Sequence, residues 1–149
     1  MKITICGSIA FLDKMRALKD ELEKSGHEVC IPWANTTDGK GNAISEEEYY
    51  KIRKSTDVKD INHWIWVRKS EEMKGYCKKV AEAEAILVAN FDKNNIPGYV
   101  GANTLMEMGL AHYLGKRIFL LNPIPEISYK EEIFGMRPVT INNNLKLIN

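Results

Sequence analysis

The segment with the clearest potential for chemistry is Gly101-Ala102-Asn103-Thr104-Leu105-Met106-Glu107-Met108-Gly109. It is typical of a flexible turn that leads into a helix, here expected over 104–114, whose first turn holds Glu107 as a lone carboxylate among apolar residues. Free backbone N–H groups and the positive end of the helix dipole would keep Glu107 ionised and favour an anionic or sugar-bearing ligand beside it. An ionised carboxylate on an apolar surface suits a nucleophile that attacks an anomeric carbon.

A structural role for Glu107 competes with this hypothesis. Thr104-x-x-Glu107 has the spacing of a capping box, in which the glutamate bonds back to the N–H of Thr104 and does nothing else. Gly109, inside the same predicted helix, indicates either the close approach of a strand or ligand or a simple packing position.

Two further acids flank the most apolar stretch of the chain, Ala85-Ile86-Leu87-Val88-Ala89. This stretch is typical of a central parallel strand covered on both faces. Glu84 precedes it and is expected at the amino end of the strand, whereas Asp92 follows its carboxyl end. Ligands bind beyond the carboxyl ends of such strands, so this geometry favours Asp92 for contact with a ligand. A solvated loop carboxylate is the alternative for both residues.

The turn Gly7-Ser8-Ile9 follows the first predicted strand and could present backbone amides and a hydroxyl to a phosphate or sugar. No Walker motif and no G-x-G-x-x-G is present, so the usual modes of nucleoside triphosphate and dinucleotide binding have no support. Neither the histidines nor the cysteines form a coherent set of metal ligands, and we expect neither metal nor cofactor. The candidate substrate-binding residues are Gly7, Ser8, Ile9, Asn90, Gly101, Asn103 and Thr104.

The elements that must position these residues alternate between strand and helix. Strands are predicted at 2–6, 29–31, 85–89, 118–121 and 139–141, and helices at 11–24, after Ser45, at 73–82, 104–114 and 126–134. Residues 33–42 read as a loop, and 63–66 cannot be assigned. The order predicts an α/β fold, a doubly wound parallel sheet of four to five strands, flavodoxin-like or Rossmann-like, in one domain over 1–149.

Composition restricts the classes of binding partner that we expect for this protein. The 149 residues carry 21 Lys and Arg against 20 Asp and Glu, a net charge of +1, so no nucleic acid or anionic membrane is expected to bind. No apolar stretch is long enough for a signal or a membrane span, so we expect a soluble cytoplasmic protein. Trp64 and Trp66 suggest core or interface packing, or otherwise a contact for another protein or a stacked base.

Three segments together resemble the nucleoside 2-deoxyribosyltransferase superfamily, which includes the 2′-deoxynucleoside 5′-phosphate N-hydrolases. Residues 5–9 resemble the first strand and the glycine-serine-isoleucine turn of the hydrolases. Residues 83–89 resemble the family's alanine-aspartate-apolar segment. Residues 101–109 resemble the segment that ends in glutamate, an apolar residue and glycine, where the glutamate is the nucleophile.

The resemblance implies a role for several residues. Glu107 would attack C1′ of a (deoxy)ribosyl group to form a glycosyl-enzyme, which water or a second base would release. Glu84 stands where the family usually has an aspartate that assists base departure; it is one methylene longer, which leaves Asp92 as a possible substitute. Ser8 falls in the turn that lines the sugar or phosphate pocket. Gly101 stands where the hydrolases have a phosphate-contacting serine and the transferases an aspartate.

The resemblance therefore implies cleavage or transfer at the N-glycosidic bond of a nucleoside or its 5′-monophosphate. It also implies a homo-oligomer, because the family builds its pockets at subunit contacts. The alternative function is non-catalytic: related nucleotide-sensing Rossmann-like domains hold a nucleotide with similar glycine-rich turns and do not turn it over.

Overall fold

The computed structural model describes residues 1–32 and 35–149. The chain, expected as one domain, divides into two compact units: residues 33–76 form one, and residues 1–32 with 77–149 form the other. Helix α3 (Trp64–Glu82) begins in the first of these units and ends in the second. Among the described residues, no helix is both long enough and apolar enough to cross a membrane.

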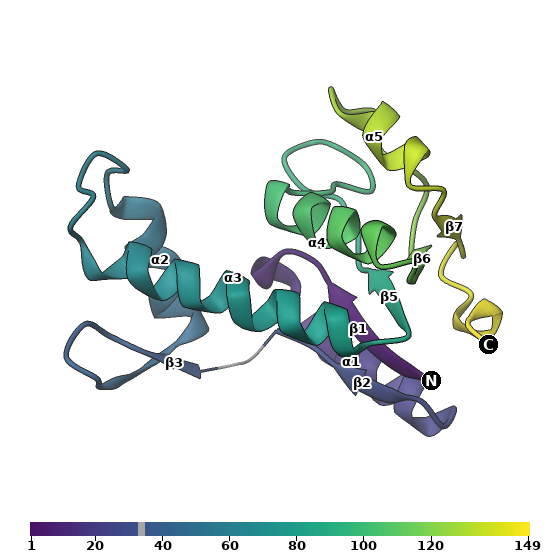
Figure 1. The fold of residues 1–149 in the computed structure, drawn as a ribbon, viewed down its shortest axis with the longest axis horizontal. Helices are drawn as coiled ribbons and strands as arrows, with labels where there is room; N and C mark the ends of the chain where they lie inside the picture. The colour runs from purple at the N-terminus through teal and green to yellow at the C-terminus, as the bar shows by residue number, and fades with distance from the viewer. Residues whose placement is uncertain (33–34) are drawn as a thin grey trace. The chain divides into compact units, whose positions relative to one another are not determined.

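The larger unit contains a five-stranded, wholly parallel sheet, which confirms the predicted α/β fold (Figure 1). The strand order is β2-β1-β5-β6-β7. Each strand boundary lies within one residue of its predicted position: β1 (Lys2–Cys6), β2 (Glu28–Cys30), β5 (Ala85–Val88), β6 (Arg117–Leu120) and β7 (Val139–Thr140).

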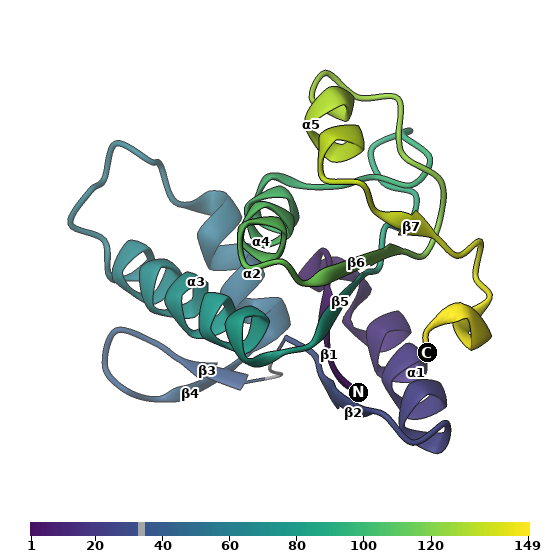
Figure 2. The ribbon, with the colours of Figure 1, turned by 45° about the vertical axis from the view of Figure 1, so that its right-hand side comes forward.

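Two helices cover opposite faces of this sheet. The crossovers β1-α1-β2 and β5-α4-β6 run in opposite directions from the centre, so right-handed connections place α1 (Leu12–Lys24) on one face and α4 (Ala102–Tyr113) on the other (Figures 1 and 2). The loops that leave β1 and β5 therefore diverge, and the sheet has its topological switch point between these two strands. The shorter helices of this unit are η1 (Ile9–Phe11), α5 (Lys130–Gly135) and η2 (Leu145–Leu147).

The central strands of the sheet, β1 and β5, are almost completely buried. Every residue of β5 is fully buried, as its continuous apolar sequence predicted, and so are Ile3 and Ile5 of β1. The alternate residues of β1, Thr4 and Cys6, are also fully buried and point to the other face. The Thr4 hydroxyl donates to the carbonyl of Lys79 at 3.1 Å, so this face packs against the end of α3.

The smaller unit corrects the prediction of a loop over 33–42. Strands β3 (Asn35–Thr37) and β4 (Ala43–Ser45) pair as an antiparallel hairpin. Its turn is stabilised locally, because the Asp38 carboxylate accepts from the N–H groups of Lys40 at 2.8 Å and Asn42 at 2.9 Å. These polar bonds form a hairpin without apolar alternation, which is why hydrophobic periodicity failed to predict it. Residues 33 and 34 of the expected loop lie outside the described residues.

Two helices complete the smaller unit. The predicted cap of α2 (Glu46–Ser55) is confirmed, because the Ser45 hydroxyl accepts from the N–H of Glu48 at 3.1 Å. The unassigned 63–66 segment begins α3, where the His63 ring accepts from the N–H of Ile65. Trp64 and Trp66 pack against the core formed by Ile44, Tyr49 and Ile65, in agreement with the packing interpretation.

Candidate functional site

Helix α4 starts two residues earlier than predicted, and this changes the interpretation of Glu107. Gly101 occupies the N-cap with an extended backbone (φ −80°, ψ 168°), and Thr104 is a buried residue within the first turn. Thr104 is therefore not a cap, and the capping-box interpretation is wrong. The expectation that Glu107 lies in the first turn is also wrong, because that turn contains no acidic residue. The N–H groups without an intrahelical acceptor belong to the N-cap and the first three residues of α4, which all precede Glu107, so Glu107 does not lie among them.

Glu107 instead meets the last residue of β1. Its half-buried side chain lies near the fully buried thiol of Cys6. Burial, and secondly the negative charge of Glu107, raise the pKa of this thiol well above its usual range. The thiol therefore stays protonated at neutral pH. The carboxylate is held at the carboxyl end of β1, beside the switch point of the sheet, where ligands bind in doubly wound folds.

The predicted turn Gly7-Ser8-Ile9 follows Cys6 directly. A Cβ on Gly7 would approach the carbonyl oxygen of Ala89 and the Met15 sulfur to 3.2 Å, so glycine lets the turn pack closely on the end of β5. The Ser8 hydroxyl caps η1 and accepts from the N–H of Ala10 at 3.4 Å. Ile9 is half-buried as the first residue of η1. The turn therefore lies at the same edge of the sheet as Glu107.

Sequence reasoning missed a cation at this edge. Nζ of Lys93 donates to the Ser8 hydroxyl at 2.9 Å and lies 5.9 Å from the centre of the Tyr99 ring. Asn94 and Asn95, both with positive φ (53° and 59°), make a two-residue turn that pairs Lys93 with Ile96. Asparagine tolerates this left-handed conformation, so the Asn-Asn pair was the available signal for the turn.

A second cation lies over an aromatic pair at the same edge. Phe11 and Phe91 pack with their ring centres 5.3 Å apart, and Nζ of Lys14 lies 4.7 Å from the centre of the Phe91 ring. Phe11 follows the β1 turn and Phe91 follows β5, so both rings come from the segments that border the switch point. The arrangement brings two half-buried aromatic rings, tilted by 60° to each other, and a positive charge together.

Asn90, a predicted binding residue, is 1% exposed, and its side chain is used to fasten loops. Nδ2 lies within hydrogen-bond distance of the carbonyls of Gly98 (3.2 Å), Asn122 (3.0 Å) and Pro123 (3.1 Å), and Oδ1 accepts from the N–H of Asn122 at 2.9 Å. Gly98 has φ +64°, and a Cβ there would lie 2.7 Å from the Pro123 oxygen. Asn90 thus holds the loop after β5 against the loop after β6.

Asn90→Asp should therefore destabilise the protein strongly. The substitution places a carboxylate against three carbonyl oxygens and removes both donors, which should lower the free energy of unfolding by about 3 kcal/mol or more. Urea denaturation measures the change. Asn103→Asp, on the exposed first turn of α4, is the matched control and should be neutral or slightly stabilising. An Asn90→Asp variant within about 1 kcal/mol of the wild type would contradict this account.

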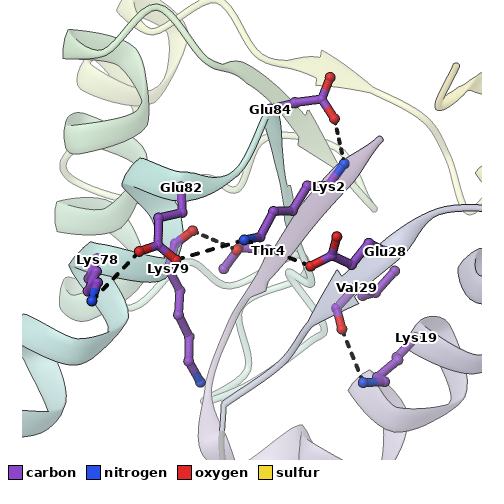
Figure 3. A network of polar contacts seen from close by, with 9 residues as sticks. All are labelled: Lys2, Thr4, Lys19, Glu28, Val29, Lys78, Lys79, Glu82 and Glu84. Carbon is purple, nitrogen blue, oxygen red and sulfur yellow. Dashed lines mark hydrogen bonds and ion pairs between the residues drawn. The ribbon is translucent and has the colours of Figure 1, made fainter.

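The two other predicted acids lie at opposite edges of the sheet. Asp92 is exposed beyond the carboxyl end of β5, where Oδ1 accepts from the N–H of Gly98 at 2.9 Å. Glu84 is exposed at the amino end, where its carboxylate accepts from the backbone N–H of Lys2 at 2.7 Å (Figure 3). Cys6 lies four positions after Lys2 along the strand, a distance of about 13 Å. The structure therefore does not bring Glu84 to Glu107.

Glu84 belongs to a different set of contacts. Around it, Nζ of Lys2 lies 3.8 Å from the carboxylates of both Glu28 and Glu82, as Figure 3 shows. These ion pairs fasten the amino ends of β1 and β2 to the end of α3, which is a structural arrangement. The expectation that Glu84 lies at the amino end of the central strand is confirmed.

The remaining predicted residues lie at the start of α4. Gly101 is the N-cap, and a Cβ there would lie 3.3 Å from the Tyr99 ring. Asn103 is exposed on the first turn, and the buried Thr104 follows it. Within the described residues, no group of three or more His, Cys, Asp or Glu side chains is placed to hold a metal ion.

Among the solved structures similar to this chain is that of the CMP N-glycosidase BcmB from Clostridium botulinum. The TM-score is 0.50 and the sequence identity 16%, over 99% of this chain and 98% of that chain. No family model and no curated protein matches the sequence. The likeness covers both chains almost completely and agrees with the parallel α/β fold described above.

Proposed function

We propose that this protein cleaves or transfers the N-glycosidic bond of a nucleoside 5′-monophosphate or nucleoside, with Glu107 as the nucleophile. The observation that carries the proposal is the position of Glu107. Its carboxylate lies near Cys6, the last residue of β1, beside the switch point, and it does not serve as a helix cap. The resemblance to the nucleoside 2-deoxyribosyltransferase superfamily and the fold shared with a CMP N-glycosidase both support this chemistry.

The reaction would proceed by double displacement. A Glu107 oxygen attacks C1′ of the sugar, the C1′–N bond breaks, and its electron pair leaves with the base, which takes up a proton. The resulting ester between Glu107 and C1′ is then attacked by water, which gives the free sugar or sugar 5-phosphate, or by the nitrogen of a second base, which gives a new nucleoside or nucleotide. Either acceptor restores the Glu107 carboxylate.

The proton for the departing base would come from the carboxyl edge. Asp92 lies on that edge and remains the candidate acid, with one oxygen already bonded to the N–H of Gly98. The proposal gives Glu84 no catalytic role, because it lies at the amino edge and bonds to Lys2.

The nucleotide's two ends have candidate partners in the same region. The ammonium of Lys93 and the hydroxyl of Ser8, 2.9 Å apart, suit the 5′-phosphate. Phe11 and Phe91 offer rings on which a planar base stacks. These groups support a monophosphate as the preferred substrate, since a nucleoside has no phosphate for the ammonium and the hydroxyl to contact.

Incubation with a panel of ribo- and deoxynucleosides and their 5′-monophosphates tests the proposal, with and without a second free base and with chromatography of the products. Release of free base without an acceptor identifies a hydrolase, whereas product formed only with the second base identifies a transferase. Absence of turnover, combined with thermal stabilisation by one nucleotide, would contradict the enzyme and favour the nucleotide-sensing alternative.

The exposed face of α4 supports assembly into a homo-oligomer. Ala102, Met106, Gly109 and Tyr113 recur at helical spacing, and Met106 and Tyr113 are 48% and 84% exposed. A Cβ on Gly109 would meet no described atom within 4 Å outside the helix backbone, so neither the close approach nor the packing contact considered for this glycine comes from this chain's described residues. A second copy packed on this face would cover these apolar side chains.

Light scattering should accordingly give the mass of a dimer or larger oligomer for the wild type. The double variant Met106→Lys/Tyr113→Glu should give the mass of a monomer, because charges replace the apolar side chains at the contact. Phe134→Glu, at an exposed position on α5, is the control and should leave the mass unchanged. A monomeric wild type at working concentration would refute the assembly.

A further inference from the structure

Lys14 is a cation at the carboxyl edge of the sheet to which the double displacement assigns no role. It lies in the first turn of α1 and is exposed. Its Nζ lies 5.3 Å from the centre of the Phe11 ring and 4.7 Å from the centre of the Phe91 ring. Because Phe11 follows the turn after β1 and Phe91 follows β5, the ammonium lies over the two rings on which we expect the base to stack.

The two carboxylates that adjoin this cluster in the sequence are bonded elsewhere. Asp13 accepts from Nη1 of Arg16 at 2.8 Å, and Asp92 accepts from the N–H of Gly98 at 2.9 Å. The positive charge of Lys14 is therefore directed at the rings, where it is attracted to their electron-rich faces. A base that enters this cluster meets aromatic rings and a cation together.

The position of Lys14 determines which edge of a bound base it can contact. Glu107 comes from α4 on one face of the sheet and Lys14 from α1 on the other, so a base whose sugar lies at Glu107 turns its remote edge toward Lys14. A base that stacks on Phe91 takes the place of the ammonium on the ring, and the ammonium moves to this edge. The move is favourable where the edge carries a keto oxygen, which accepts a hydrogen bond, and unfavourable where it carries an amino group, whose N–H groups point at the cation.

We propose that Lys14 is a specificity-determining residue, which donates a hydrogen bond to a keto oxygen on the edge of the base remote from the sugar. The inference rests on the function proposed above. Nucleotides with a 6-keto purine or a 4-keto pyrimidine are then preferred over their 6-amino and 4-amino counterparts. As the C1′–N bond breaks, its electron pair passes to the base, and the keto oxygen takes up part of the negative charge beside the ammonium. Lys14 keeps its protons throughout, and the proton for the base comes from the acid of the proposed reaction.

Two pairs of 5′-monophosphates that differ at this edge test the inference: those of inosine and adenosine, and those of uridine and cytidine. In the pair with the faster turnover, kcat/KM of the wild type should be roughly tenfold higher for the keto member. Lys14→Met should remove this preference, whereas Lys14→Arg keeps the cation and should retain it. Phe91→Leu should weaken both members alike, because stacking does not distinguish the edges of a base. Lys24→Met, at the other end of α1, is the matched control and should change nothing.

A binding measurement separates this inference from the proposed function, since it needs no turnover. Calorimetric titration of Glu107→Gln with the same nucleotides should show tighter binding of the keto member, and Lys14→Met in that background should remove the difference. If the wild type turns over nucleotides but prefers the amino member, or if Lys14→Met leaves the keto-to-amino ratio unchanged, the role of Lys14 is wrong while the nucleophile stands. If the binding preference depends on Lys14 but no nucleotide reacts, the proposed function fails and the recognition of the base stands.

Discussion

Glu107→Gln should abolish turnover while leaving the melting temperature almost unchanged. An amide cannot form the glycosyl ester, so we expect kcat to fall at least about a thousandfold. In other covalent enzymes, removal of the nucleophile lowers kcat by up to about 10⁶-fold. The fold should tolerate the change because glutamine has nearly the same shape as glutamate and Glu107 is not a cap for α4. Product release from the best substrate of the panel, together with thermal unfolding, measures both effects.

A matched control guards against a general effect of charge removal. Glu21→Gln changes an exposed glutamate on α1 and should retain full activity. The nucleophile would be refuted if Glu107→Gln kept more than a tenth of wild-type turnover. A drop in the melting temperature with activity intact would instead give Glu107 a structural role.

Lys93→Met should weaken binding of monophosphates and leave nucleosides unaffected. The ammonium at Ser8 would contact a 5′-phosphate, and loss of a charge-assisted hydrogen bond costs about 1.5–3 kcal/mol, a rise in KM of roughly 10- to 150-fold. KM for a nucleoside, which has no phosphate, should change less than twofold by the same reasoning. Steady-state kinetics on a matched nucleoside and monophosphate pair give the comparison.

Charge and position can be separated with two further variants. Lys93→Arg keeps the cation and should recover most of the monophosphate preference, with the preference of the wild type falling as salt concentration rises. Lys146→Met removes an exposed lysine at the C-terminal end of the chain and serves as the control. An equal rise in KM for nucleoside and monophosphate after Lys93→Met would show that Lys93 does not bind the 5′-phosphate.

The strands were predictable because the sheet is buried on both faces. A short, continuous apolar run such as Ala85–Val88 is typical of a strand buried on both faces of a parallel sheet. The turn at Gly7 marks the end of β1 in the sequence. The beginning of α4 was misplaced because Gly101 caps it without a side-chain hydrogen bond, whereas Thr104 has the residue type of a cap. Local sequence preference chose the wrong residue, and tertiary packing buried Thr104 inside the helix.

The candidate site was predictable only in part, because its contacts are long-range. Lys93 and Ser8 are 85 positions apart, and nothing near either residue indicates that they meet. Glu107 and Cys6 likewise come together only once α4 packs against the sheet. Asn90 was expected to bind substrate from its position after β5, but its amide bonds to the backbone of three loop residues. A sequence locates an edge of a sheet more readily than it assigns the side chains along that edge.

The most direct test of the central claim is mass spectrometry of the protein quenched during turnover of its best substrate. The account predicts an adduct with the mass of the sugar, or of the sugar phosphate, on the peptide that contains Glu107. The adduct should disappear when the substrate is exhausted and should be absent from Glu107→Gln. Turnover with no adduct on Glu107, together with an active Glu107→Gln variant, would contradict the account.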